Sequence, residues 1–156
     1  MYDTFIGVDP GKSGAIVVLD EMDPGVPEIF KTDYPLDLYI ERFYDCVCAN
    51  GVAVLEKVHA MPGQGVTSMF TFGRNFGQLE MFLEGLSLNG GWHHVTPQQW
   101  QKFFDLFKKE GETKTQKKNR HKKLAKKLFP GVDVTHANAD ALLIAEYCRR
   151  IYGGNK

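Results

Sequence analysis

The chain has 156 residues, 43% of them hydrophobic and 24% charged, as in an ordinary globular domain. No apolar run approaches the roughly 18–20 residues that span a bilayer. Residues 1–4 lack the basic and apolar segments of a signal peptide. We therefore expect one domain over residues 1–156 in the cytoplasm, either of a bacterium or of a phage-infected host cell.

The first half of the chain predicts short strands and one helix. The apolar, β-prone run 5–9 and the run 15–19 flank a Gly-containing turn, which indicates a hairpin. A third strand is expected at 27–32 after the turn signal Asp23-Pro24-Gly25. Apolar residues at helical spacing predict a helix over 36–49. A buried strand then follows at 52–55.

The second half is mainly helical. A long helix is expected at about 67–86, a short strand at 92–95, and a helix from Thr96-Pro97 to about Leu106. The basic stretch 115–129 predicts a helix, and a last helix begins near His136 and runs to about Tyr152. The order β-β-β-α-β-α-β-α-α-α indicates an α/β fold. We expect a mixed five-stranded sheet that is flanked by helices, with an antiparallel three-strand start and then parallel strands.

A net charge of zero conceals an uneven distribution. Residues 108–127 hold ten Lys and Arg residues against two acidic ones, which leaves nine basic and seventeen acidic residues elsewhere. A solvated helix face is the ordinary explanation for a charge run. Here the cations would repel one another without a polyanion partner, so we expect nucleic-acid contact.

The three cysteines give no sign of a disulfide framework. Cys46 and Cys48 form a C-x-C pattern, and Cys148 lies near the end of the chain. An odd count without a second pair also argues against an all-cysteine zinc site. We expect free thiols.

Three carboxylates have positions that suit chemistry. Asp9 and Glu56 each directly follow an apolar strand, and ligand sites of open α/β sheets gather at such carboxyl ends. Asp140 lies early in the last predicted helix, beside apolar residues. Taken singly, each has an ordinary explanation: a turn initiator, a solvated strand end, or an acid favoured by the helix dipole.

Together the three carboxylates offer hard oxygen ligands to Mg²⁺ or Mn²⁺. Two such ions, about 4 Å apart, can hold the attacking water and the leaving oxygen of a phosphodiester in line. His136 is four residues before Asp140 and would share its helix face. We expect His136 to be a fourth ligand, a general base or a phosphate contact, with an exposed helix-start residue as the alternative.

Several motifs occur in an order known from one family. They are Gly7-Val8-Asp9-Pro10-Gly11, Glu56 after its strand, Phe72-Gly73-Arg74, Thr96-Pro97 with Trp100, Leu128-Phe129-Pro130 and Ala139-Asp140-Ala141-Leu142. The whole chain thereby resembles RuvC-type Holliday-junction resolvases, and its ending resembles their phage-like branch. The resemblance implies an RNase H-like fold, a homodimer, dependence on Mg²⁺ or Mn²⁺, and paired nicks in a four-way DNA junction.

The resemblance also implies roles for particular residues. Asp9, Glu56 and Asp140 would be metal ligands. The family usually has a fourth ligand about one turn before Asp140; Ala137 stands there, and His136 is the nearest substitute. A lysine near the active site is implied as well, with Lys117 and Lys118 as candidates.

The expected DNA contacts are cationic residues of the basic stretch, of the turn after Asp9 and of the 67–86 helix. They are Lys12, Arg74, Lys114, Lys117, Lys118, Arg120, Lys122 and Lys123. Gly73 and Gly77 lie four residues apart in the 67–86 helix, where glycine costs up to about 1 kcal/mol. Close packing on the chain's own sheet would compensate; the resemblance suggests a dimer interface instead.

Three other interpretations remain. The same carboxylates would serve an RNase H-like nuclease that acts on other branched DNA or on RNA, because they bind a phosphodiester and not a junction. A catalytically silent DNA-binding module could keep the same fold. A sugar-kinase or actin-type ATPase also begins with an Asp-x-Gly strand turn, but the chain is short for its two domains.

Overall fold

The computed structural model describes residues 2–32, 43, 50–58, 63 and 65–154. The strands are β1 (Thr4–Val8), β2 (Ala15–Asp20), β3 (Glu28–Lys31), β4 (Gly51–Glu56) and β5 (Trp92–Val95). The helices of the described residues are α2 (Val66–Gly85), α3 (Pro97–Phe103), α4 (Lys114–Leu128) and α5 (Ala139–Tyr152). Each strand and helix lies within a few residues of the range that the sequence predicts.

The five strands form one mixed sheet in the order β3-β2-β1-β4-β5. The first three pair antiparallel, whereas β4 pairs parallel with β1 and β5 pairs parallel with β4. A hairpin joins antiparallel neighbours, but parallel neighbours need a crossover, and α2 supplies the one between β4 and β5. The predicted mixed five-stranded sheet is confirmed.

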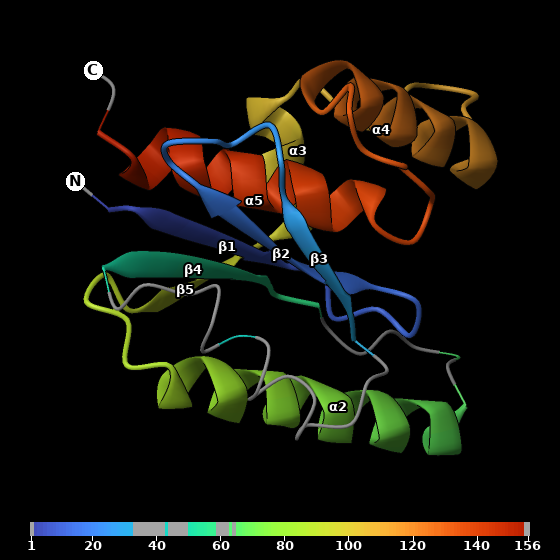
Figure 1. Cartoon of the computed structure of the whole chain (residues 1–156). Coiled ribbons are helices and arrows are strands. Elements are labelled where there is room, and N and C mark those ends of the chain that lie inside the picture. Colours follow the sequence, from blue (N-terminus) through green and yellow to red (C-terminus); the bar gives the residue numbers. More distant parts are fainter. Residues whose placement is uncertain (1, 33–42, 44–49, 59–62, 64, 155–156) are drawn as a thin grey trace.

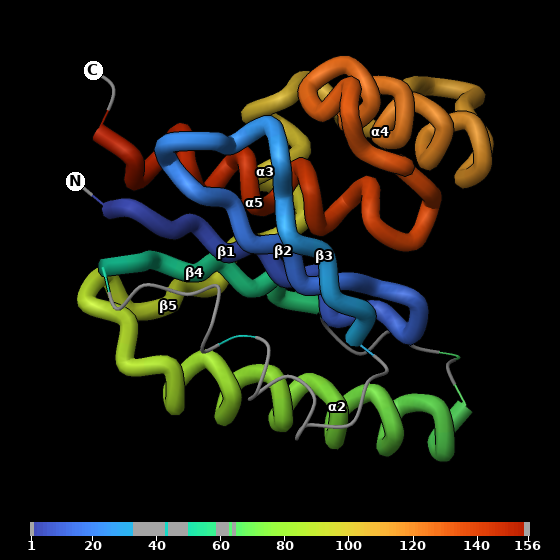
Figure 2. Tube along the Cα trace, in the orientation of Figure 1, coloured from blue at the N-terminus to red at the C-terminus, as the bar shows by residue number. Residues whose placement is uncertain are grey.

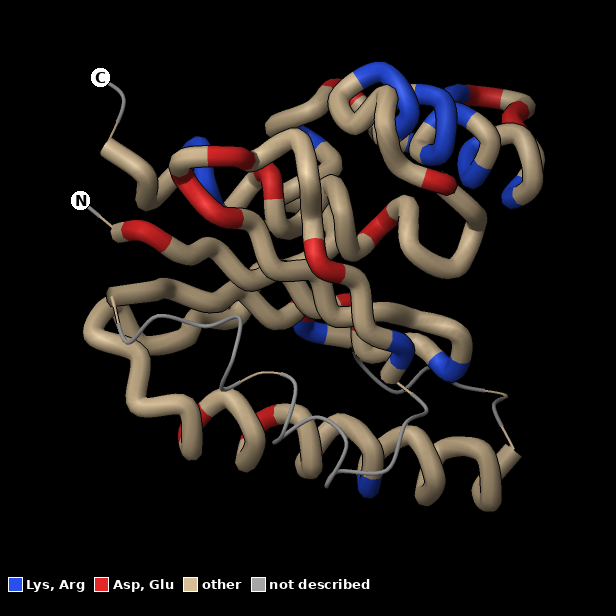
Figure 3. Tube along the Cα trace, viewed as in Figure 1, with Lys and Arg blue, Asp and Glu red and all other residues tan. Residues whose placement is uncertain are grey.

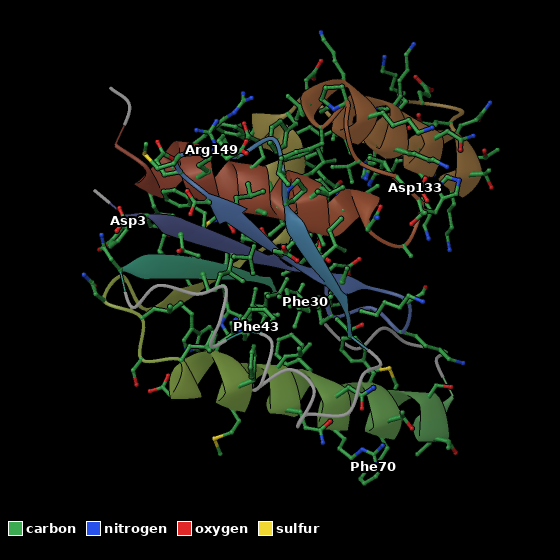
Figure 4. The ribbon with its side chains drawn as sticks, viewed as in Figure 1. Asp3, Phe30, Phe43, Phe70, Asp133 and Arg149 are labelled. Carbon is green, nitrogen blue, oxygen red and sulfur yellow. The ribbon has the colours of Figure 1, made fainter. Side chains whose placement is uncertain are left out.

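Helices cover both faces of this sheet (Figure 1). One face carries α2, and the other carries α5 with α3 and α4 beyond it. Under α2, the rings of Phe30, Phe43 and Phe82 pack with centroid separations of 4.6 and 4.9 Å. Figure 4 shows Phe30 and Phe43 between the sheet and α2. On the other face, fully buried residues of α5 such as Leu142 and Ile144 pack among the core residues of β1, β2 and β4.

The α5 backbone approaches the sheet closely at Gly7, in the middle of β1. A Cβ at this position would lie 2.1 Å from the backbone nitrogen of Ala145 and 2.8 Å from the carbonyl oxygen of Ala141. Only a residue without a side chain lets the α5 backbone lie this near the strand. Because Asp140 directly precedes Ala141, Gly7 helps to set how close Asp140 comes to the end of β1.

The last helix begins three residues later than predicted, at Ala139 instead of near His136. Side chains hold the preceding residues in a turn, since Asn138 Oδ1 accepts from Thr135 N at 2.7 Å and Thr135 Oγ1 accepts from Ala137 N at 3.2 Å. Such local side-chain bonds compete with helix formation. Of the helix predicted at 36–49, the structure describes only Phe43, which is helical and buried.

Cys148 is a free, buried thiol, whereas Cys46 and Cys48 lie outside the described residues. In the part of the chain that the structure describes, no helix is both long and apolar enough to cross a membrane.

Candidate functional site

Asp9 and Glu56 lie side by side at one edge of the sheet. Val8 pairs with Leu55 in the parallel register of β1 and β4, so the next residues along the two strands are Asp9 and Glu56. Figure 2 traces β1 into the turn that follows Asp9, at the end of the sheet toward which β4 also runs. The register thus brings the two carboxylates of the strand ends together.

Asp140 reaches the same end of the sheet from the first turn of α5. Its charge acts on both strand-end carboxyls and raises the pKa of each, which places the three carboxylates in one electrostatic cluster. Two strand ends and one helix start therefore lie within electrostatic range of one another.

Each of the three carboxylates accepts one hydrogen bond from the protein. The pairs are Gly11 N to Asp9 Oδ1 at 2.9 Å, Trp100 Nε1 to Glu56 Oε1 at 2.7 Å, and His121 Nδ1 to Asp140 Oδ1 at 2.7 Å. Because a carboxylate only accepts, the ring nitrogen of His121 is the donor in the last pair if Asp140 is ionised. One oxygen of each carboxylate is thereby held in place.

Within the described residues, the second oxygen of each carboxylate has no hydrogen-bond partner. No hydrogen bond from the described residues reaches Asp9 Oδ2, Glu56 Oε2 or Asp140 Oδ2. Among the described residues, the buried side-chain polar atoms that lack a partner are Glu21 Oε2 and His121 Nε2. The three oxygens are not among these fully buried atoms.

Burial makes negative charge unfavourable at this edge. It raises the pKa of the Asp9 carboxyl to about 6, against the lowering effect of the Gly11 N–H, while Asp140 adds to the rise. Burial likewise raises the pKa of Glu56 to about 7, reinforced by the charge of Asp9 and opposed by the Trp100 hydrogen bond. Perturbed carboxyl groups that converge at one place are typical of functional sites.

Two lysines of α4 face these carboxylates. The positive charge of Lys118 lowers the pKa of Asp9, and that of Lys117 lowers the pKa of Glu56, although burial outweighs both effects. The Lys117 ammonium also donates to Gln101 Oε1 at 2.7 Å, which ties the first turns of α4 to α3. Lys117 and Lys118 are therefore close enough to act electrostatically on these carboxylates.

The remaining charge of α4 forms a cationic surface (Figure 3). Lys and Arg gather along this helix at the same end of the sheet as the carboxylates. Most of the predicted DNA-contact side chains on it are exposed or half-buried and unpaired within the described residues. They are Lys114, Lys118, Lys122 and Lys123.

Arg120, like Lys117, already has partners among the described residues. Its guanidinium donates to both carboxylate oxygens of Glu112, and to the carbonyl oxygen of Phe107 at 2.6 Å. These bonds fix the connection between α3 and α4. The hydrogen bonds from Arg120, together with that from Lys109 N, lower the pKa of Glu112 to about 2. Arg120 is thus already used within the chain, as Lys117 is through its bond to Gln101.

The other predicted contacts lie elsewhere. Lys12 is exposed in the turn after Asp9, beside the carboxylate edge. Arg74 is exposed on α2, which lies across the sheet from α4. Arg74 therefore does not form one continuous surface with the lysines of α4.

His136 does not share a helix face with Asp140. It lies in the turn before α5, where its side chain is exposed and has no hydrogen bond or ion pair within the described residues. The i,i+4 argument required both residues to be helical, and the side-chain bonds of the 135–138 turn prevent this. The structure gives His136 no contact with the carboxylate cluster.

Trp100 and His121, which contact Glu56 and Asp140, have no role predicted from the sequence. Trp100 is fully buried, and His121 is almost fully buried, at 3% exposure. Their rings meet edge to face with centroids 5.3 Å apart. One signal was available: His121 and Ala125 are four residues apart and form the buried face of a helix that is otherwise rich in lysine.

The oxygen donors fit a hard divalent cation. Within the described residues, no three His, Cys, Asp or Glu side chains are grouped so that they could hold a metal ion by themselves. Mg²⁺ usually takes only one or two carboxylates, and waters and substrate phosphates complete its octahedron. The residues present therefore fit an ion shared with a phosphate better than an ion held in a protein cage.

Comparison with known proteins supports the fold. No family model and no curated protein matches the chain. The structure of RuvC from T. thermophilus in complex with a Holliday junction substrate is similar, with a TM-score of 0.55 and 13% sequence identity over 96% of both chains. A further Thermus thermophilus RuvC structure gives 0.50 and 14%, again over 96% of both chains. The chain thus has a RuvC-like, RNase H-like fold.

Proposed function

We propose that this chain is a divalent-metal-dependent endodeoxyribonuclease that resolves four-way DNA junctions by paired phosphodiester hydrolysis. One observation carries the proposal: three carboxylates converge beside a cationic helix, each with one oxygen held and the other free. Carboxyl groups that are costly to ionise are stabilised by a bound cation, and the adjacent cationic helix can bind a DNA phosphate. The site therefore suits a divalent cation and a phosphate bound together.

Asp9, Glu56 and Asp140 would hold Mg²⁺ or Mn²⁺, with two ions in each active site. Bound there, the ions would lower the pKa of a water and stabilise charge on the leaving oxygen of the phosphodiester. The protein contributes the orientation of the ligands through Gly11, Trp100 and the histidine of α4. His136 has no contact with the cluster in the structure, so we do not extend the ligand set to it.

The α4 helix would position the DNA backbone. Its lysines can neutralise phosphates, and Lys117 and Lys118 lie close enough to the carboxylates to bring the scissile phosphate to them. Lys12 borders the same edge from the turn after β1. Such contacts orient a strand without reading its sequence.

A homodimer would supply the second active site. Paired nicks require two sets of carboxylates, and the described residues of one chain provide one set. The outer face of α2 has the features of an interface: Phe70 and Met81 are 74% and 72% exposed, and a Cβ added at Gly73 or Gly77 would meet nothing within 4 Å. Figure 4 shows Phe70 directed away from the sheet. Own-sheet packing therefore does not explain these two glycines.

Cleavage of defined DNA substrates tests the proposal. With Mg²⁺ or Mn²⁺, we expect symmetric nicks in a synthetic four-way junction and none in a linear duplex, a flap or an RNA–DNA hybrid. Equal cleavage of the duplex would contradict junction resolution. Cleavage of only the flap or the hybrid would identify a nuclease with another substrate.

The variant Asp140→Asn separates binding from chemistry. It keeps the shape of the side chain and its hydrogen-bonding oxygen but removes the charge that would attract a metal ion. We expect junction binding to persist and cleavage to be lost. A wild-type chain that binds the junction but cleaves no branched DNA with either metal would show a silent binding module instead.

A further inference from the structure

Two of the three carboxylates are held by residues of the helices that pack above them. Trp100 of α3 donates its indole N–H to Glu56, and His121 of α4 donates its ring N–H to Asp140, each at 2.7 Å. The two donors contact each other, with ring centroids 5.3 Å apart. A continuous chain of side chains therefore joins the end of β4 to the start of α5 through α3 and α4.

The sequence places Trp100 for this contact through the start of α3. Val95, the last residue of β5, pairs with Glu56, and the next residue, Thr96, caps the helix together with Gln99. Pro97 at the first helical position fixes the entry angle. Trp100 thus lies one turn into the helix, directly beside the strand end that bears Glu56.

The register of α4 on α3 is fixed twice. His121 meets Trp100, and one turn earlier the Lys117 ammonium donates to Gln101 Oε1 at 2.7 Å. All these groups are buried or half-buried, and Gln101 is 9% exposed. Residues four apart on one helix therefore bind residues adjacent on the other, which prevents α4 from sliding or rotating.

Glu56 and Asp140 repel each other, so they need such restraint. Without a hydrogen-bond partner, the two carboxylate side chains would rotate apart to reduce this repulsion. That rotation would separate the oxygens that bind a shared cation. Hydrogen-bond partners of metal ligands orient them, and loss of such a partner typically weakens metal binding by about 10–100-fold.

We infer that Trp100 and His121 are positioning residues that hold Glu56 and Asp140 with their free oxygens directed to a shared cation. This inference rests on the proposed function. It also gives α4 two roles. The lysines on its exposed face would contact the DNA, and His121 on its buried face orients Asp140. Neither residue touches the substrate in this account.

Variants of His121 separate its donor from its shape. His121→Phe keeps a ring against Trp100 and removes the donor, whereas His121→Asn supplies an N–H near the position of the lost Nδ1. Trp100→Phe likewise removes the indole donor from Glu56. Matched controls exist away from the site: Trp92 Nε1 donates to Glu84 at 2.8 Å, and His94 Nε2 lies 3.1 Å from Glu80 Oε1.

The first measurement is Mn²⁺ affinity, by electron paramagnetic resonance without DNA, beside junction affinity in EDTA. We expect His121→Phe and Trp100→Phe to bind Mn²⁺ about 10–100-fold more weakly than wild type, with junction affinity unchanged. His121→Asn should recover most of the Mn²⁺ affinity, and Trp92→Phe and His94→Phe should lose none. Wild-type Mn²⁺ affinity in His121→Phe, or no recovery in a folded His121→Asn, would overturn the inference.

Crystal structures separate this inference from the proposed function. If the wild type binds no Mn²⁺, the proposed function fails. The positioning role is then tested by the rotamer of the Asp140 carboxylate alone. In His121→Phe we expect the Asp140 carboxylate to leave its wild-type rotamer, and in His121→Asn to keep it. An unmoved Asp140 in His121→Phe would overturn the positioning role whatever the metal result.

Discussion

At the scale of single residues, burial disfavours the ionised forms of Asp9 and Glu56. Metal binding requires these ionised forms. The pKa of Glu56 rises from 4.5 to about 7, so between these values the folded protein holds a proton that the unfolded chain releases. Stability therefore falls as the pH rises through this range, and it stays lower above pH 7. A bound cation would reverse the loss, because it favours the ionised form.

Glu56→Gln should stabilise the metal-free protein at neutral pH. Glutamine keeps the acceptor for Trp100 and removes the costly charge. In EDTA we expect the variant to match wild type near pH 4.5 and to exceed it by about 2–3 kcal/mol at pH 8, as measured by urea unfolding. Adding Mg²⁺ should stabilise the wild type and not the variant.

Glu84→Gln is the matched control for this substitution. Glu84 also accepts from an indole, that of Trp92, but it is exposed on α2. We expect its stability to follow that of wild type at every pH. A Glu56→Gln protein that shows no gain at pH 8 would mean that the Glu56 charge is not costly in the folded state.

The single residues also show what the sequence could and could not predict. Asp9 and Glu56 could be found because a carboxylate that ends an apolar strand has a predictable place in an α/β sheet. Trp100 and His121 could not be assigned their partners, because those contacts depend on how α3, α4 and α5 pack. The helix face expected to join His136 to Asp140 does not form, because two side-chain hydrogen bonds delay the start of α5.

At the scale of elements, α4 has two faces with different tasks. His121 and Ala125 form its buried face, and lysines occupy the rest. Lys114 and Lys118 lie one turn apart at the end of the helix that is near the carboxylates, whereas Lys126 and Lys127 lie in its last turn. A helix this cationic is stabilised by packing and its capping box, with Thr113 and Gln116 bonding reciprocally.

Lys114→Ala with Lys118→Ala should weaken junction binding in a salt-dependent way. Each lost phosphate contact reduces the slope of log K against log salt by about 0.9, so we expect a slope shallower by about 1.8 in EDTA. Lys126→Ala with Lys127→Ala removes the same charge from the other end of the helix and should leave the slope unchanged. Equal effects of the two pairs would show a diffuse charge effect instead of localised contacts.

The element boundaries were predicted well where periodicity is strong. The alternation and apolar runs of β1, β2 and β4 gave their bounds to within a residue or two, and Thr96-Pro97 marked the start of α3. The mixed sheet followed from the element order. Periodicity does not report how closely elements pack, which is why the role of Gly7 beneath α5 emerges only from the structure.

At the scale of the whole molecule, the carboxylate edge and the outer face of α2 have different partners. The sheet separates α2 from α4, so the proposed dimer interface does not compete with the cationic surface (Figures 1 and 3). The sequence left the glycine pair of α2 open between two explanations. The open space at both glycines excludes packing on the chain's own sheet as their explanation. We therefore propose that a second chain packs there.

Gly73→Leu with Gly77→Leu should convert a dimer into a monomer. Leucine fills the open stripe on α2 that a second helix would need, while its better helix propensity keeps the chain folded. Sedimentation velocity should show a wild-type dimer and a monomeric variant. Gly131→Leu, in an exposed turn with open space around it, should remain dimeric. A wild-type monomer both free and on the junction would contradict the dimer.

The central claim is that Asp9, Glu56 and Asp140 bind divalent cations together, and anomalous scattering from Mn²⁺ tests it most directly. In crystals of the protein with junction DNA and Mn²⁺, we expect anomalous peaks at about 2.1 Å from the free oxygens of these carboxylates, beside a DNA phosphate. Mn²⁺ bound only elsewhere, or absent from this edge at saturating concentration, would contradict the account.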